Sequence, residues 1–226
     1  MKQLQKAKSL KDQIYDIVKE DIINQTYKNN TVLNEKKISQ ALDVSKTPVR
    51  EALKALEAEG WVEYVPYKGI LVKQMSLDDL KDVFRVRKCL EIMAVESAVK
   101  KITPPLLQEL HNSMQRQEAL LINNEPVVGE FINYDLEFHG ILLKISGSHL
   151  LKDLIGQMRD KSKSFGMQAI FSSRSRYKET ITEHRAVYEA VAAKDLHAAK
   201  EAMAVHIDNT FNAAMQYLSS HAVKES

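Results

Sequence analysis

Apolar side chains recur at helical spacing along the first sixty residues and predict three short helices. The first covers residues 8–24, the second residues 35–42, and the third runs from Thr47 to about residue 59. Gly60 follows the third helix, and glycine is a common helix terminator. Because residues 43–45 leave room for only a short turn between the second and third helices, the pattern predicts a helix-turn-helix.

The third helix has two distinct faces. Thr47 and Pro48 resemble a helix start, because a hydroxyl caps free N–H groups and proline loses no bond at the first helical position. The apolar stripe consists of Val49, Ala52, Leu53 and Leu56. The other face carries, at its N-terminal end, Lys46, Thr47 and Arg50. A recognition helix meets base edges and phosphates at that end. The alternative is an amphipathic helix whose charges are only solvated.

Two β-prone runs follow, at residues 61–65 and 70–72, around a Pro/Gly turn. A hairpin after a helix-turn-helix is a wing, with Lys68 and Gly69 at its tip. Beyond it the chain is helical in pattern, and the expected helices cover residues 76–101, 103–123, 126–145, 149–171, 178–194 and 195–219.

The predicted fold class is therefore mainly α, with an N-terminal winged helix-turn-helix and a C-terminal all-α antiparallel helical bundle. We expect a DNA-binding domain over residues 1–73, a linker over 74–78 and an effector-binding and dimerisation domain over 79–226. The net charge is only +2, so a DNA-binding function must be argued from where the cations lie. A single cysteine, no signal peptide and no apolar run long enough to cross a bilayer predict a cytoplasmic protein.

Several short sequence motifs resemble those of a known protein family. Residues 44–53 read Val-Ser-Lys-Thr-Pro-Val-Arg-Glu-Ala-Leu, residues 56–62 read Leu-Glu-Ala-Glu-Gly-Trp-Val, and Lys68-Gly69 follows. These motifs resemble the winged-helix domain of the GntR family of bacterial transcription regulators. The remainder resembles the helical FCD effector domain of the FadR-type subfamily, through Arg87 to Glu91, Asp135 to His139, Glu183-His184 and His206.

The resemblance implies a set of DNA contacts on a palindromic operator, bound by a homodimer. The candidates are Lys36, Lys46, Thr47, Arg50, Lys68 and Gly69. Arg50 is expected to read a base, whereas Lys36 and Lys68 are expected to hold phosphate or the minor groove. Lys46 replaces the usual arginine, and a lysine cannot form the planar fork that grips guanine.

Four potential metal ligands lie on apolar helix faces in the second domain. Asp135 and His139 are four residues apart, on one side of a helix, and His184 and His206 each share a face with apolar residues. Buried polar groups need partners, and a divalent cation would satisfy all four at once. One carboxylate and three imidazoles suit zinc, nickel, manganese or iron. The alternative is a metal-free core in which these groups bond to one another.

By the same resemblance, Arg87 is placed to pair with a carboxylate of a small organic acid; the alternative is a structural ion pair with a neighbouring acid. The expected function is a ligand-responsive transcriptional regulator, with repression relieved by the effector. Two other functions are a metal-dependent hydrolase-type enzyme and a regulator that binds effector without metal. The sequence contains no motif that places a general base, so an enzyme is not expected.

Overall fold

The computed structural model describes residues 8–122, 128–165 and 174–222. The chain divides into two compact units between Ser76 and Leu77, and each unit is described by itself. Parts of the predicted helices, namely residues 123, 126–127 and 166–171, lie outside the described residues, as do both ends of the chain. None of the described helices is long and apolar enough to cross a membrane.

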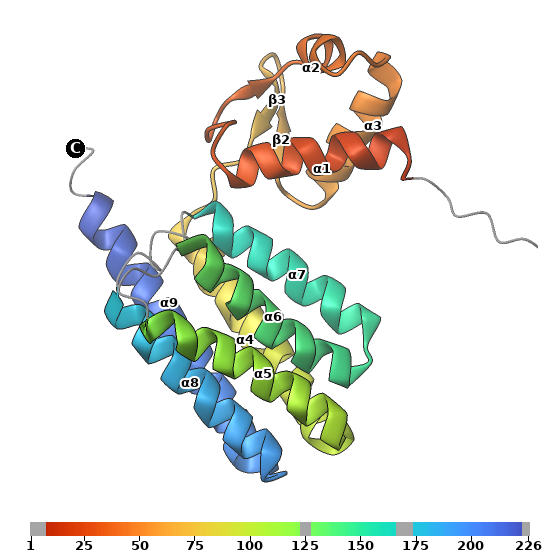
Figure 1. Ribbon diagram of the computed structural model, residues 1–226. Helices are drawn as coiled ribbons and strands as arrows, with labels where there is room; N and C mark the ends of the chain where they lie inside the picture. Colours follow the sequence, from red (N-terminus) through yellow and green to blue (C-terminus); the bar gives the residue numbers. More distant parts are fainter. Residues whose placement is uncertain (1–7, 123–127, 166–173, 223–226) are drawn as a thin grey trace, which may run out of the picture. The chain divides into compact units, whose positions relative to one another are not determined.

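The first unit combines three helices with a small antiparallel sheet (Figure 1). Its elements are α1 (Leu10–Ile23), β1 (Val32–Leu33), α2 (Glu35–Ala41), α3 (Lys46–Ala58), β2 (Val62–Val65) and β3 (Gly69–Val72). The strand order is β1-β3-β2, and the hairpin pairs Val62 with Val72 and Val65 with Gly69. The predicted wing is thus present, and the two-residue β1, which sequence analysis missed, extends it through β3.

The start of α3 differs from the prediction. The helix begins at Lys46 with Ser45 as the N-cap, so Thr47 lies inside the first turn and does not cap the helix. Pro48 is then the third helical residue. Proline is tolerated there for the same reason as at the first position, because N–H groups of the first turn have no partner within the helix.

The core of the first unit is built from the apolar faces that the sequence predicted. The predicted stripe of α3 is fully buried: Val49, Ala52, Leu53 and Leu56 each have 0% exposure. These side chains belong to one cluster with Trp61 and with residues of α1 and of the sheet, namely Ile14, Val18, Ile22, Leu33, Val62 and Val72. Burial of this stripe leaves the opposite face of α3 in water.

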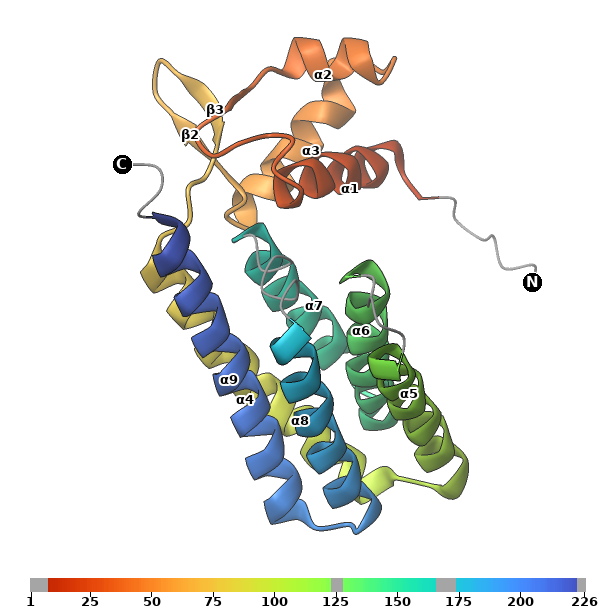
Figure 2. The same ribbon diagram turned by 60° about the vertical axis from the view of Figure 1, so that its left-hand side comes forward.

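In the second unit, the described residues form six helices (Figure 2). They are α4 (Leu77–Lys101), α5 (Pro104–Ile122), α6 (Val128–Ser146), α7 (His149–Ser164), α8 (Arg174–Ala192) and α9 (Leu196–Ala222). The last two residues of the expected linker, 77 and 78, are already helical, and α8 begins four residues before its predicted start. Helix α4 packs against α6, α7, α8 and α9, while α5 packs against α6 and α8.

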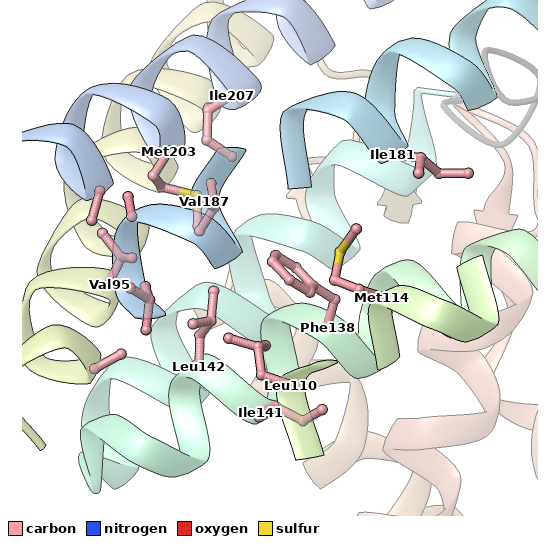
Figure 3. Packing of buried hydrophobic residues seen from close by; sticks show 14 of the residues in the cluster. Val95, Leu110, Met114, Phe138, Ile141, Leu142, Ile181, Val187, Met203 and Ile207 are labelled. Atoms are coloured by element: carbon pink, nitrogen blue, oxygen red, sulfur yellow. The ribbon is translucent and has the colours of Figure 1, made fainter. Parts of the chain in front are cut away.

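The inner faces of α4, α5, α6, α8 and α9 form one apolar core (Figure 3), while Leu151 and Ile155 of α7 pack with Ala94 and Leu143 in a smaller cluster. Leu110 and Met114 from α5 and Phe138 and Leu142 from α6 lie in the same cluster as Met203 from α9, and each is at most 2% exposed. The predicted fold class is confirmed: a winged helix-turn-helix unit and an all-helical bundle. A polar cluster interrupts the core of this second unit, on α6, α8 and α9.

Candidate metal centre and nucleic-acid interface

Asp135 and His139 on α6, His184 on α8 and His206 on α9 meet inside the helical unit. One donor atom from each lies within 4.8 Å of all the others. The three histidines are at most 2% exposed, and the Asp135 side chain is 14% exposed. The structure therefore brings together all four residues that the sequence named as candidate metal ligands.

The atoms that converge are the Nε2 nitrogens and one carboxylate oxygen. Nε2 of His139 lies 3.2 Å from Nε2 of His206. Asp135 Oδ1 lies 3.4 Å from Nε2 of His184 and 3.9 Å from Nε2 of His139. Metal–nitrogen bonds of about 2.1 Å place neighbouring ligand atoms roughly 3 to 3.4 Å apart, so the closest of these spacings suit ligands of one ion.

Each imidazole is oriented by a hydrogen bond from its other nitrogen. The Nδ1 atoms pair with acceptors from three different helices: His139 with Glu91 Oε2 at 3.2 Å, His184 with Gln117 Oε1 at 2.7 Å and His206 with Glu183 Oε2 at 2.8 Å. Carboxylate and amide oxygens only accept, so each Nδ1 carries the proton and donates it. Every Nε2 in a neutral ring then presents a lone pair to the shared centre, which is the tautomer of a metal-ligating histidine.

Without a cation this arrangement leaves a conflict. The Nε2 atoms of His139 and His206 face each other at 3.2 Å, and two lone pairs cannot hydrogen-bond. Nε2 of His184 is buried and has no hydrogen-bond partner among the described residues. Such orphaned buried acceptors call for an explanation. A divalent cation would remove both problems, so the residues present fit a metal ion.

The electrostatics of the cluster favour the neutral imidazole. Burial, assisted by the positive charge of Arg159, lowers the pKa of His139 to about 4. Burial, with His206 and His139 as neighbours, also holds the pKa of His184 well below its ordinary value. These two rings are therefore unprotonated at neutral pH, and an unprotonated Nε2 is what a metal ion requires.

Buried arginines hold two of the outer acceptors in place. Arg159 donates to Glu91 Oε1 through Nη2 at 2.9 Å. Arg176 donates to the two carboxylate oxygens of Glu183 at 2.9 and 3.1 Å. Burial alone would raise the pKa of Glu183, but hydrogen bonds from His206 and Arg176 outweigh it and lower the pKa to about 2. The outer carboxylates therefore stay ionised and keep accepting from the histidines.

Sequence analysis did not assign these outer roles. Glu91 and Glu183 were noted only within family motifs, and no role was predicted for Gln117, Arg159 or Arg176. Their common signal is a polar residue on an otherwise apolar helix face. That signal was used for the histidines and could have been applied to these five.

Arg87 lies beside the same cluster. It is 6% exposed, and its Nε lies 3.5 Å from Glu91 Oε1, the carboxylate that Arg159 also holds. Burial and the charge of Arg159 lower the pKa of Arg87 from its ordinary value. The structural ion pair considered from the sequence is thus present, although at the long end of hydrogen-bonding distance. Two arginines therefore share this one carboxylate.

The candidate DNA contacts lie on the exposed surface of the first unit. Lys36 on α2, Lys46, Thr47 and Arg50 on α3, and Lys68 at the hairpin are all exposed, and Gly69 is partly buried. Gly69 has φ of +96°, a backbone angle that favours glycine. Tyr67, which sequence analysis overlooked, is fully exposed at the hairpin turn with φ of +66°.

Arg50 has a partner within the protein. Its Nε donates to Glu35 Oε1 at 3.1 Å, and its Nη2 donates to Glu35 Oε2 at 2.9 Å. The Arg50 side chain is still 57% exposed. The residue expected to read a base is therefore held by a carboxylate on the neighbouring helix.

Two family assignments match this architecture. Residues 10–72 match the family described as bacterial regulatory proteins, gntR family, and residues 82–209 match the FCD domain, which alone covers more than half of the chain. The chain is a GntR-family regulator with an FCD domain. Regulators of this family bind DNA and typically dimerise, and the expectation of a transcriptional regulator and not an enzyme is confirmed.

Relatives of this GntR regulator have similar lengths. It is 27% identical over 197 residues to the uncharacterized HTH-type transcriptional regulator YdhC of Bacillus subtilis, covering 87% of each chain. It is 24% identical over 214 residues to the HTH-type transcriptional repressor RspR of Escherichia coli K12, covering 95% of this chain and 92% of that one. Among solved structures, E. coli McbR/YncC has the same fold, with a TM-score of 0.73 at 23% identity over 93% of this chain and 99% of that one.

Proposed function

We propose that this regulator is a metal-dependent sensor of a small organic acid that represses transcription until the acid binds. A homodimer would bind a palindromic operator through Lys36, Lys46, Thr47, Arg50, Lys68 and Gly69. In this proposal residues 1–73 bind DNA, residues 74–78 connect, and residues 79–226 bind the effector and dimerise. The relative RspR is named a repressor, which favours repression as the sign of regulation.

The observation that carries the proposal is the convergence of three Nε2 atoms and the Asp135 carboxylate. Asp135, His139, His184 and His206 would hold the ion, which could be zinc, nickel, manganese or iron. When bound, the ion would supply a positive Lewis-acidic centre that attracts a carboxylate oxygen. The hydrogen bonds to Nδ1 of each histidine set the ring orientations before the ion arrives.

Charge balance around the cluster supports an anionic effector. Three largely buried acids and three buried arginines surround the histidines, namely Asp135, Glu91, Glu183, Arg87, Arg159 and Arg176. Their formal charges cancel, three against three, so a divalent ion would leave two positive charges inside the bundle. Buried charge is costly unless it is paired. A small acid with one or two carboxylates would supply that pairing, with Arg87 as a second contact.

Effector binding would act on DNA binding through a shift between two states of the dimer. A ligand changes an equilibrium only by its difference in affinity for the two states, and the effect is reciprocal. We therefore expect operator DNA and effector to weaken each other's binding by the same factor. A helical unit that both holds the effector and dimerises can convey such a shift to two DNA-binding units.

The metal site is tested by metal analysis of full-length protein purified without chelator. Wild type should contain close to one equivalent of a divalent transition metal, and an Asp135→Ala/His184→Ala variant should contain little. His197→Ala is the matched control, because His197 on α9 is 92% exposed and lies outside the cluster. Equal metal content in wild type and the double variant would contradict the metal site and favour a regulator that binds effector without metal.

DNA reading is tested on the DNA upstream of the protein's own gene. Wild type and Arg50→Ala are compared at two salt concentrations. Wild type should bind tightly and lose affinity as salt rises, because phosphate contacts release counterions. The variant should lose sequence preference, since a bidentate base contact contributes about 1–3 kcal/mol of discrimination. Equal, weak binding by both proteins would contradict the reading role of Arg50 at that site.

A further inference from the structure

The ion pair between Glu35 and Arg50 joins the two helices of the helix-turn-helix. Glu35 is the first residue of α2, and Arg50 lies in the second turn of α3, fifteen residues later. Both carboxylate oxygens accept, at 3.1 and 2.9 Å, and the Glu35 side chain is 26% exposed whereas that of Arg50 is 57% exposed. A bidentate pair fixes the orientation of a guanidinium as well as its position.

The pair with Glu35 does not use the end-on edge of the Arg50 guanidinium. A guanidinium has five N–H donors, and Glu35 takes one from Nε and one from Nη2, along the side edge. Three donors remain on Nη1 and Nη2, and they include the end-on pair that points away from the side chain. That end-on pair is a fork able to grip O6 and N7 of guanine. The carboxylate therefore holds Arg50 from the side without occupying its tip.

The charge of Glu35 also affects whether Arg50 binds a phosphate or the edge of a base. Hydrogen bonds from Arg50, with the charges of Lys46 and Lys54, lower the pKa of Glu35, so its carboxylate stays ionised at neutral pH. A phosphate approaching the same guanidinium would meet this negative charge, whereas the neutral edge of a base would not. An exposed arginine without such a partner is free to swing to the DNA backbone, which carries no sequence information.

We propose that Glu35 is a specificity-determining positioning residue: it orients Arg50 for end-on contact with a guanine and disfavours its capture by phosphate. Glu35 touches no base in this proposal and acts through Arg50. The inference rests on the proposed reading role of Arg50. It assigns a role in DNA recognition to Glu35, which is not among the six DNA-contact candidates. It implies that removal of the Glu35 charge weakens sequence discrimination without weakening overall DNA binding.

The test uses the full-length, metal-loaded protein and a selection from random-sequence duplexes. Affinities are then measured for the selected duplex and for a random duplex of equal length. Glu35→Gln keeps the shape of the side chain and removes its charge. The control, Glu57→Gln, removes an equal charge from an exposed residue of the same helix as Arg50, two turns further along. Circular dichroism and Trp61 fluorescence check that each variant is folded.

We expect Glu35→Gln to lower the ratio of selected to random affinity by at least about fivefold, which is within the discrimination of one base contact. The loss should concentrate at one guanine position, and random-duplex affinity should stay equal or rise. Glu57→Gln should change the ratio less than about twofold, below the same discrimination. In an Arg50→Ala background, Glu35→Gln should have no further effect on the ratio, because the residue that it positions is gone.

Contrary results separate this inference from the proposed function. If wild type enriches a sequence but Glu35→Gln keeps the same ratio, the inference is wrong and the proposed function stands. The inference would also be wrong if Glu35→Gln raised the affinities for the selected and the random duplex by the same factor. Glu35 would then only block the binding of Arg50 to DNA. If wild type enriches no sequence, the proposed reading role of Arg50 fails, and the inference fails with it.

Discussion

The histidine cluster makes the metal-free helical unit sensitive to mild acid. Burial, with the charge of Arg159, lowers the pKa of His139 from 6.5 to about 4. Between these two pH values the His139 imidazole is protonated in the unfolded chain but not in the folded protein. The free energy of unfolding therefore rises with pH in this range and falls as the solution is acidified from pH 7.

The size of the effect follows from the two pKa values. One pKa unit corresponds to about 1.4 kcal/mol, so His139 alone accounts for roughly 3 kcal/mol in full, of which about 2 kcal/mol is lost between pH 7 and pH 5. His184, whose pKa burial also lowers, acts in the same direction. The acid effect of the intact cluster should thus exceed the value for His139 alone.

The assay is urea unfolding of full-length protein in the presence of a chelator, at pH 7 and pH 5. Far-UV circular dichroism follows mainly the helical unit. Trp61, the only tryptophan, is 3% exposed in the core of the first unit, so its fluorescence follows that unit separately. We expect the free energy of unfolding to depend strongly on pH when it is measured by circular dichroism and weakly when it is measured by Trp61 fluorescence. A His139→Gln variant should lose about 2 kcal/mol of the pH dependence.

Two results would refute this reasoning. One is a helical unit equally stable at pH 7 and pH 5, which would mean that the folded protein accepts protons on the cluster without cost. The other is an unchanged pH dependence in His139→Gln, which would place the responsible group elsewhere. Neither depends on the identity of a metal or an effector, so the experiment examines the burial of the cluster directly.

Three further predictions follow from single contacts. Gln117→Ala, which removes the acceptor at Nδ1 of one ligand, should weaken metal binding about 10- to 100-fold in a metal titration, whereas the exposed Gln108→Ala should leave it unchanged. Lys68→Ala should weaken binding to all duplexes and lower the slope of log affinity against log salt by about 0.9, measured by anisotropy; an unchanged slope would argue against a phosphate contact. Leu53→Ala, at a fully buried site, should lower the free energy of unfolding followed by Trp61 fluorescence by about 2–5 kcal/mol, and a loss below 1 kcal/mol would contradict the core assignment.

Much of the fold was accessible from the sequence because amphipathic periodicity is a local property. The stripe of α3 from Val49 to Leu56 is buried as predicted, and the helices lie close to their expected positions. The errors have local causes too. Proline is tolerated throughout the first turn of a helix, so Pro48 could not locate the start of α3. A two-residue strand such as β1 has no periodicity to detect, and it exists because β3 offers it a partner.

The candidate metal ligands were also accessible, because a histidine on an apolar face must point inward. The sequence did not show which nitrogen of each ring faces the other ligands. That depends on the acceptors at Nδ1, which come from α4, α5 and α8 and lie 48, 67 and 23 residues along the chain from the histidines that donate to them. Glu91, for example, is 48 residues from His139.

Which segments are helical, which face of each helix is apolar and which inward positions carry polar groups could be predicted from the sequence, because these properties depend on neighbours within a few residues. The partners of those polar groups became known only from the packing of the folded chain. It brought together the Nε2 atoms of His139 and His206, which are 67 residues apart in the chain, and it placed Glu35 against Arg50, which the sequence showed only on the exposed face of its helix. Contacts between helices depend on how whole apolar faces pack together, and no short stretch of sequence contains that information.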